Sequence, residues 1–172
     1  MSVRRAGAED AMGIAIAHVR SWQAAYRGLM PQDYLDNLDA EQRRPLWERI
    51  LGEAQWPRAG TFVAEDSRNV VGFAHFCPAR DADAEPASAG ELAAIYLVPE
   101  AWGTGLGREL MISGLSALSE AGFGEAMLWV LDTNSRARRF YEAGGWRADG
   151  AVKQDGRMGF VLNEVRYRRP LP

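Results

Sequence analysis

The chain has 172 residues, of which 47% are hydrophobic and 25% charged, and its formal net charge is −3 at pH 7. We expect residues 1–172 to form a single soluble globular domain, and the negative charge argues against a nucleic-acid partner. One cysteine, two histidines, no secretion signal and no apolar run of membrane-spanning length predict a cytoplasmic protein with no disulfide, metal site or membrane partner.

In the first third of the chain, the residue pattern predicts a short strand, residues 2–6, followed by three helices. Acidic residues, a first-position proline and a capping aspartate favour helix N-termini, whereas glycine favours C-termini. The residues that give these signals are Glu9, Asp10, Gly28, Pro31 and Asp39. The first helix carries an apolar stripe that includes His18, Trp22 and Tyr26.

From Thr61 onward the hydrophobic pattern predicts strands and then strands alternating with helices. The predicted strands are 61–65, 70–77, 92–98, 126–131, 146–148 and 160–168, and the predicted helices run from about 106 to 121 and from about 135 to 143. Residues 78–90 are rich in Ala, Asp, Pro and Ser and predict a mobile loop. The element order predicts an α+β fold, a mixed sheet with helices on both faces.

The stretch from Glu91 to Arg108 combines a strand, a glycine turn and a helix. Pro99 stops the apolar run, and glycines follow at alternate positions, 103, 105 and 107. Glycines let main-chain N–H groups approach an anion closely, and a helix N-terminus adds unpaired donors and a favourable dipole. The stretch therefore predicts a site for a phosphorylated ligand.

Two nucleotide sites fit this stretch poorly. A P-loop needs Lys followed by Ser or Thr after its last glycine, but Arg108 and Glu109 follow Gly107. A dinucleotide site needs G-x-G-x-x-G directly after the strand and an acid about 20 residues further on. Here the spacing is G-x-G-x-G, and Asp132 lies too far away, so a nicotinamide-dependent oxidoreductase is a distant alternative.

Two motifs resemble those of the GNAT superfamily of acyl-CoA-dependent N-acyltransferases. The segment Trp102-Gly-Thr-Gly-Leu-Gly107 is similar to the family's [Q/R]-x-x-G-x-[G/A] motif, with Trp102 in place of the usual Gln or Arg. The segment from Leu128 to Trp146 is similar to a later motif, a strand, an Asn and a helix that carries F-Y-x-x-x-G-[FW]. The resemblance implies a GNAT-like, mostly antiparallel sheet in which the strands at 92–98 and 126–131 part to admit a pantetheine arm.

The resemblance also implies acetyl-CoA as the acetyl donor and assigns residues to it. Residues that would bind the pyrophosphate are Trp102, Gly103, Thr104, Gly105, Leu106, Gly107 and Arg108. The backbone of Ile95, Tyr96 and Leu97 would pair with pantetheine. Asn134 matches a family position that touches the cofactor, although it can equally be a plain helix cap.

The catalytic acid and base are predicted separately. Tyr141 matches the family's general acid, because a phenol can protonate a departing thiolate. For the base, Glu91 stands where many family members carry a Glu that acts directly or through water. His75 is its rival and also a substrate-side candidate.

We therefore expect an acetyl-CoA-dependent N-acetyltransferase that acts on a primary amine of a small molecule by direct transfer in a ternary complex. Trp22 and Tyr26 would line a partly apolar acceptor site. A catalytically silent acyl-CoA sensor and a protein N-terminal or lysine acetyltransferase remain alternatives, and monomer and homodimer both stay open.

Overall fold

The structure is a computed structural model that describes residues 1–85 and 87–172. Its strands are β1 (Ser2–Arg5), β2 (Gly60–Asp66), β3 (Asn69–Pro78), β4 (Ala89–Leu97), β5 (Glu125–Leu131), β6 (Arg147–Asp155) and β7 (Leu162–Pro170). Its helices are α1 (Ala11–Ala25), α2 (Gln32–Asp36), α3 (Ala40–Gly52), α4 (Leu106–Glu120) and α5 (Ser135–Ala143), with short 3₁₀ turns η1 (Ala8–Asp10) and η2 (Pro99–Ala101).

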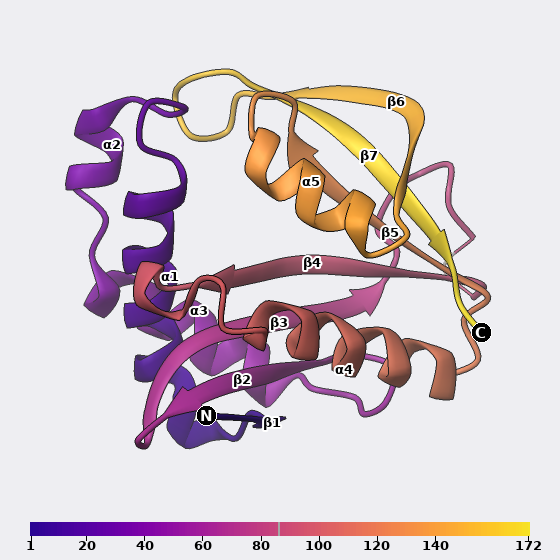
Figure 1. Ribbon diagram of the computed structural model, residues 1–172, viewed down its shortest axis with the longest axis horizontal. Coiled ribbons are helices and arrows are strands. Elements are labelled where there is room, and N and C mark those ends of the chain that lie inside the picture. Colours follow the sequence, from indigo (N-terminus) through magenta and orange to yellow (C-terminus); the bar gives the residue numbers. More distant parts are fainter. Residues whose placement is uncertain (86) are drawn as a thin grey trace.

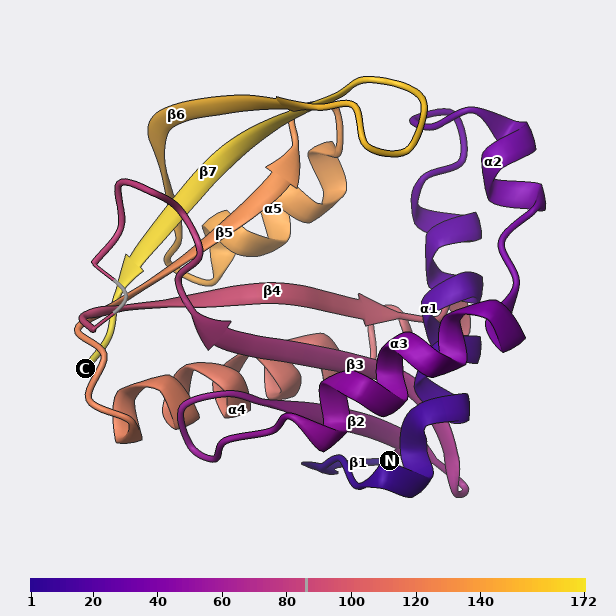
Figure 2. The same ribbon diagram turned by 180° about the vertical axis from the view of Figure 1, so that it is seen from behind.

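The strands form one sheet in the order β1-β2-β3-β4-β5-β7-β6. Every neighbouring pair is antiparallel except β4 and β5, which run parallel. Figures 1 and 2 show α4 and α5 on one face of the sheet and α1 and α3 on the other. The predicted α+β class, with a mostly antiparallel sheet and helices on both faces, is confirmed.

Strands β4 and β5 stay together over only three residue pairs. Ala89, Gly90 and Glu91 face Glu125, Ala126 and Met127, and no pairing continues beyond them in the described part of the two strands. The register of β4 against β3 also shifts beside Ala93, because His75 faces Ala94 whereas Phe76 faces Leu92. A β-bulge of this kind bends a strand away from its neighbour. The predicted parting of the two strands is thus present (Figure 1). Glu91 is the last paired residue, at the closed end of the gap.

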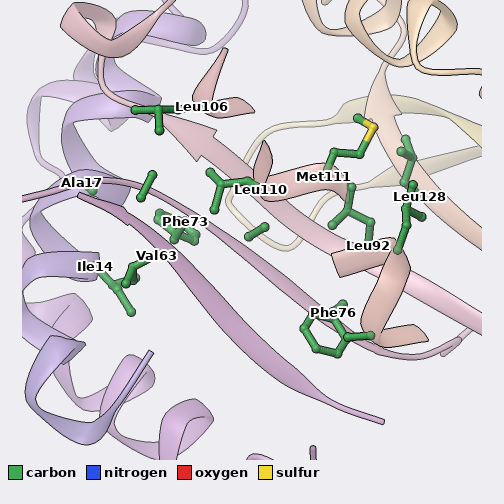
Figure 3. Close-up of a cluster of buried hydrophobic side chains, with 14 of the residues drawn as sticks. Ile14, Ala17, Val63, Phe73, Phe76, Leu92, Leu106, Leu110, Met111 and Leu128 are labelled. Carbon is green, nitrogen blue, oxygen red and sulfur yellow. The ribbon is translucent and has the colours of Figure 1, made fainter. Parts of the chain in front are cut away.

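The main core lies between α4 and the first half of the sheet, and continues on the other face under α1 and α3. Its labelled members in Figure 3 are Ile14, Ala17, Val63, Phe73, Phe76, Leu92, Leu106, Leu110, Met111 and Leu128. Helix α4 lies close to β4 because Gly90 leaves room for the Leu118 side chain, whose nearest atom would be 2.6 Å from an added Cβ. This packing holds the end of α4 beside the start of β4.

Two details differ from the sequence-based expectations. Strand β6 spans nine residues rather than the predicted 146–148, because it resumes after a bulge around Gly150, where φ is +88°. In a sequence, a glycine that can adopt a positive φ indicates a turn, so the predicted strand stops short of the observed one. In the segment predicted as a mobile loop, Pro78 belongs to β3 and Ala89 and Gly90 belong to β4, and ion pairs that its composition did not indicate hold described residues to the sheet: Arg166 bonds Asp81 and Asp83. In the described residues, no helix is both long and apolar enough to cross a membrane.

Candidate active site

A cavity of about 580 Å³ lies where β4 and β5 part. Its lining comes from both faces of the sheet. Gly107 and Tyr141 approach from the side of α4 and α5, whereas Trp22 of α1 and Tyr26, just after that helix, approach from the opposite side. The cavity therefore passes between the two strands, from Trp102 and Gly107 to the space under α1, and its lining does not include Gly103 or Gly105.

The glycine turn is shaped by backbone conformations that favour glycine. The φ angles of Gly103 and Gly105 are +76° and +91°, and an added Cβ at either would meet nothing within 4 Å. Gly107 is different, because its Cβ would lie 3.2 Å from Leu97 and 3.4 Å from Phe140. The first two glycines thus make the turn and leave its surface open, while the third lets α4 lie against β4 and α5. Of the remaining predicted residues of the segment, Leu106 is a core residue and Arg108 is exposed.

Trp102 turns back onto the end of β4 and carries a cation on its ring. Its Nε1 donates to the Leu97 carbonyl at 2.9 Å, and the Arg136 guanidinium lies 3.4 Å from the ring centre. Both side chains line the cavity, and partial burial lowers the pKa of Arg136. In the described part of the chain no carboxylate pairs with this arginine. Sequence analysis missed Arg136, although its place in the first turn after Asn134 is a signal that could have found it.

Asn134 caps α5 and also lines the cavity. Its side-chain oxygen accepts from the Ala137 N–H at 3.1 Å, which is the plain cap that the sequence left open. Ile95, Tyr96 and Leu97 of β4 line the cavity as well. Because β4 has no strand partner on this side after Glu91, the main chain in this part of the strand is free of a sheet neighbour there.

Tyr141 projects from α5 into the cavity. The residue is 8% exposed and packs against Trp146 and Tyr167. Burial raises the pKa of its phenol above the ordinary value, so the hydroxyl keeps its proton at neutral pH. No described residue makes a hydrogen bond with that hydroxyl. The Tyr141 side chain therefore presents an unshared proton donor to whatever occupies the cavity.

Glu91 lies at the closed end of the strand gap and is 4% exposed. Arg80 holds both of its oxygens. The Arg80 main-chain N and Nε donate to Oε2 at 3.2 and 2.9 Å, and Nη2 donates to Oε1 at 2.8 Å. Both residues line the cavity. A carboxylate held this way can orient a water molecule more readily than it can take a proton directly.

The structure does not bring His75 to the cavity. Its Nδ1 lies 3.0 Å from the Thr61 hydroxyl, and its ring packs edge-on against Trp47. Burial lowers its pKa to about 4, so the imidazole is neutral at pH 7. The residue is absent from the cavity lining, whereas Trp22 and Tyr26, predicted together with it, are part of that lining.

The cavity on the α1 side has an aromatic wall and a charged wall. The Tyr26 and Tyr96 hydroxyls lie 2.9 Å apart, and Trp22 packs edge-on against Tyr26. Opposite them, β7 contributes Leu162 and Glu164. The β6–β7 loop lies against α2, where Tyr34 and Phe160 are in ring contact at 5.0 Å (Figure 2).

Sequence analysis missed Glu164 and the other charged residues of this wall. Side chains along a strand alternate between the two faces of the sheet. In the sheet that alternation places Leu162, Glu164 and Arg166 on one face, and this face looks into the cavity and the loop.

Comparison with known proteins gives consistent results. The sequence profile of the Acetyltransferase (GNAT) family matches residues 20–146. The chain is 37% identical over 145 residues to the uncharacterized N-acetyltransferase YuaI of Bacillus subtilis (strain 168), covering 83% of this chain and 78% of that protein. It is 33% identical over 118 residues to a mycothiol acetyltransferase of Thermobispora bispora, covering 67% of this chain but only 37% of that protein. The structure of yncA, an acetyltransferase from Salmonella typhimurium with acetyl-CoA, superposes with a TM-score of 0.72 at 20% identity, covering 100% of this chain and 94% of that one.

Proposed function

The chain belongs to the acetyltransferase (GNAT) family, and on this premise we propose that it acetylates a primary amine of a small molecule by direct transfer from acetyl-CoA. That the protein is an N-acetyltransferase with acetyl-CoA as cosubstrate follows from the family. The acceptor class, the ternary complex and the residue roles are the proposal. The observation that carries it is the cavity between the parted strands, with Tyr141 inside it.

The residues around the glycine turn fit the donor. Gly103 and Gly105 leave an open turn before α4, and the first turn of a helix offers unpaired N–H groups to an anion. Arg136, held on the Trp102 ring, adds a cation without a carboxylate partner in the described chain. It supplies the positive charge that the tryptophan at this motif position lacks. The unpaired side of β4 at Ile95–Leu97 suits the amide groups of a pantetheine arm.

Tyr141 is proposed as the general acid. As the amine nitrogen bonds to the thioester carbon, the carbon–sulfur bond breaks and the sulfur takes the phenolic proton. Burial raises the pKa of Tyr141, so this proton is in place at neutral pH, and its hydroxyl has no competing acceptor among the described residues. A thiolate whose thiol has a pKa near 8.5 is a weaker base than phenolate, so the proton has to be transferred while negative charge develops on the departing sulfur.

Glu91 remains the proposed base, acting through water. Deprotonation of a primary amine with a pKa near 10.4 costs about 4–5 kcal/mol of free energy at pH 7, and the enzyme must offset this cost. Since Arg80 occupies both carboxylate oxygens, Glu91 would orient a water chain that leads the proton out of the cavity rather than bond to the amine itself.

The acceptor site is proposed under α1, between the Trp22–Tyr26 wall and β7. Its partly apolar lining and its cover by α2 and the β6–β7 loop favour a small amine over an extended protein segment. The experiment is a panel of amines assayed for free thiol released from acetyl-CoA. Amine-dependent release with at least one small primary amine supports the proposal. Release with protein or peptide amines alone would assign the site to a protein acetyltransferase instead.

A further inference from the structure

Among the carboxylates of the described residues that line the cavity, one has no partner. Three acidic residues of the described chain line it: Glu91, Asp155 and Glu164. Glu91 is held by Arg80, and Asp155 accepts from the Arg157 guanidinium at 2.7 Å. No hydrogen bond or ion pair to the Glu164 side chain is present among residues 1–85 and 87–172. An unpaired carboxylate in a partly closed cavity is costly unless a ligand supplies the missing cation.

Lys153 and Arg157 act on the Glu164 charge from a distance, and each is engaged elsewhere. Lys153 faces Glu164 directly across strands β6 and β7, yet its ammonium lies over the Trp129 ring, 4.2 Å from the ring centre. Glu164 is half-buried, and this burial raises the pKa of its carboxyl. The charged and titratable groups that face it are Lys153 and Asp155 of β6, Arg157 of the following loop, Tyr26 at the C-terminal end of α1 and Tyr96 of β4.

We propose that Glu164 binds the positive charge of the acceptor, so that the enzyme selects primary amines that arrive as cations with an apolar body. The carboxylate lies on the β7 wall, and Trp22 and Tyr26 stand across the same cavity to pack against the apolar part. A cation held between a carboxylate and aromatic rings gains from both the charge pair and the ring faces. This inference rests on the proposed function, since it names the class of acceptor that the same site takes.

Two measurements separate Glu164→Gln from the wild type. The first is direct binding of benzyltrimethylammonium, a permanent cation that cannot be acetylated, by calorimetry in the presence of coenzyme A. We expect the Gln variant to bind it at least 10-fold more weakly. The second is steady-state kinetics with benzylamine, where KM for the amine should rise at least 10-fold while KM for acetyl-CoA stays within about 2-fold.

The matched control is Glu120→Gln, which removes the same charge from the exposed end of α4. It should bind the quaternary cation as the wild type does. Acidification should weaken that binding in the wild type and in this control, because protonation of Glu164 removes its charge and burial raises the pKa of this carboxyl. In Glu164→Gln the same change should have little effect.

Failure of this inference is distinguishable from failure of the proposed function. Equal affinity for benzyltrimethylammonium in Glu164→Gln and Glu120→Gln would overturn the inference, whether or not an amine is acetylated. Absence of amine-dependent thiol release by the wild type would overturn the proposed function, while the calorimetry would still decide whether Glu164 binds a cation. An unchanged unfolding midpoint with acetyl-CoA shows that Glu164→Gln has kept its fold.

Discussion

The two buried phenols of α5 and β7 illustrate how single residues of the same type differ in role. Tyr167 accepts from Arg138 Nε at 3.0 Å and donates to Glu142 at 2.8 Å, so its hydroxyl is committed to the protein. Tyr141 packs against Tyr167, but no described residue engages its hydroxyl, and it lines the cavity. A free, protonated hydroxyl in the cavity is what the departing sulfur requires.

Replacement of Tyr141 by Phe should lower kcat by roughly 10²–10⁴-fold, because the ring stays and the proton donor is lost. Acetyl-CoA affinity should remain near that of the wild type. Tyr167→Phe is the control, since it removes a hydroxyl whose hydrogen bonds stabilise the fold. It should reduce stability without a comparable loss of kcat. Equal kcat in the wild type and Tyr141→Phe would mean that the thiolate leaves without the phenol.

At the scale of elements, the turn between η2 and α4 is the part on which donor binding depends. Gly105 is the residue immediately before α4 and has a left-handed φ of +91°. Gly122, just after the same helix, has the same φ and equally open surroundings. Replacing either glycine should strain the backbone to a similar extent, but only Gly105 lies in the proposed phosphate site.

We expect Gly105→Asp to abolish the rise in melting temperature caused by acetyl-CoA. A carboxylate there would repel the phosphates and obstruct the N–H groups of the turn. At about 100 times its Kd, acetyl-CoA should stabilise the wild type by about 2.7 kcal/mol. Gly122→Asp should lose about 1–2 kcal/mol of stability through the same φ, yet keep the full shift. A retained shift in Gly105→Asp would contradict the assignment of the turn to phosphate.

The elements themselves were predictable from sequence wherever the signal is local. Asp39 caps α3, accepting from the Glu41 N–H at 2.8 Å, and Gly144 ends α5 as expected, because caps act on adjacent residues. The sequence could not place contacts between distant residues. Arg80 holds Glu91 across a strand turn, and Arg166 joins Asp81 and Asp83 from 83 or more positions away. Glu164 was missed for the same reason, since its cavity exists only once β5 and β7 pair.

At the scale of the whole molecule, the buried histidines make stability depend on pH. His18 accepts from Trp47 Nε1 through Nδ1 at 3.1 Å, so protonating that nitrogen would break the bond. Burial lowers the pKa of His18 to about 3 and that of His75 to about 4, whereas the unfolded values lie near 6.5. The unfolded chain therefore takes up these protons at a higher pH than the folded chain does. The stability that neutral histidines contribute is complete above about pH 6.5 and is lost as pH falls toward 4.

Denaturant unfolding between pH 7 and pH 4.5 should show this effect. Each buried histidine can contribute a slope of at most about 1.4 kcal/mol per pH unit in that window. His18→Gln, whose amide oxygen can still accept from Trp47, should decline with a shallower slope than the wild type. Identical slopes for the two proteins would mean that His18 takes up its proton at the same pH in the folded chain as in the unfolded chain.

The enzyme as a whole is proposed to couple release of coenzyme A to formation of an amide in one step. The most direct test follows free thiol and acetylated amine in the same reaction, with acetyl-CoA and a small primary amine that is a cation at neutral pH. We predict that thiol and acetamide appear in equal amounts at every time point, and that no acetyl group remains on the protein when the amine is omitted. Thiol release without acetamide, an acetylated protein, or acetyl-CoA binding without release for any amine in the panel would contradict direct acetyl transfer to an amine.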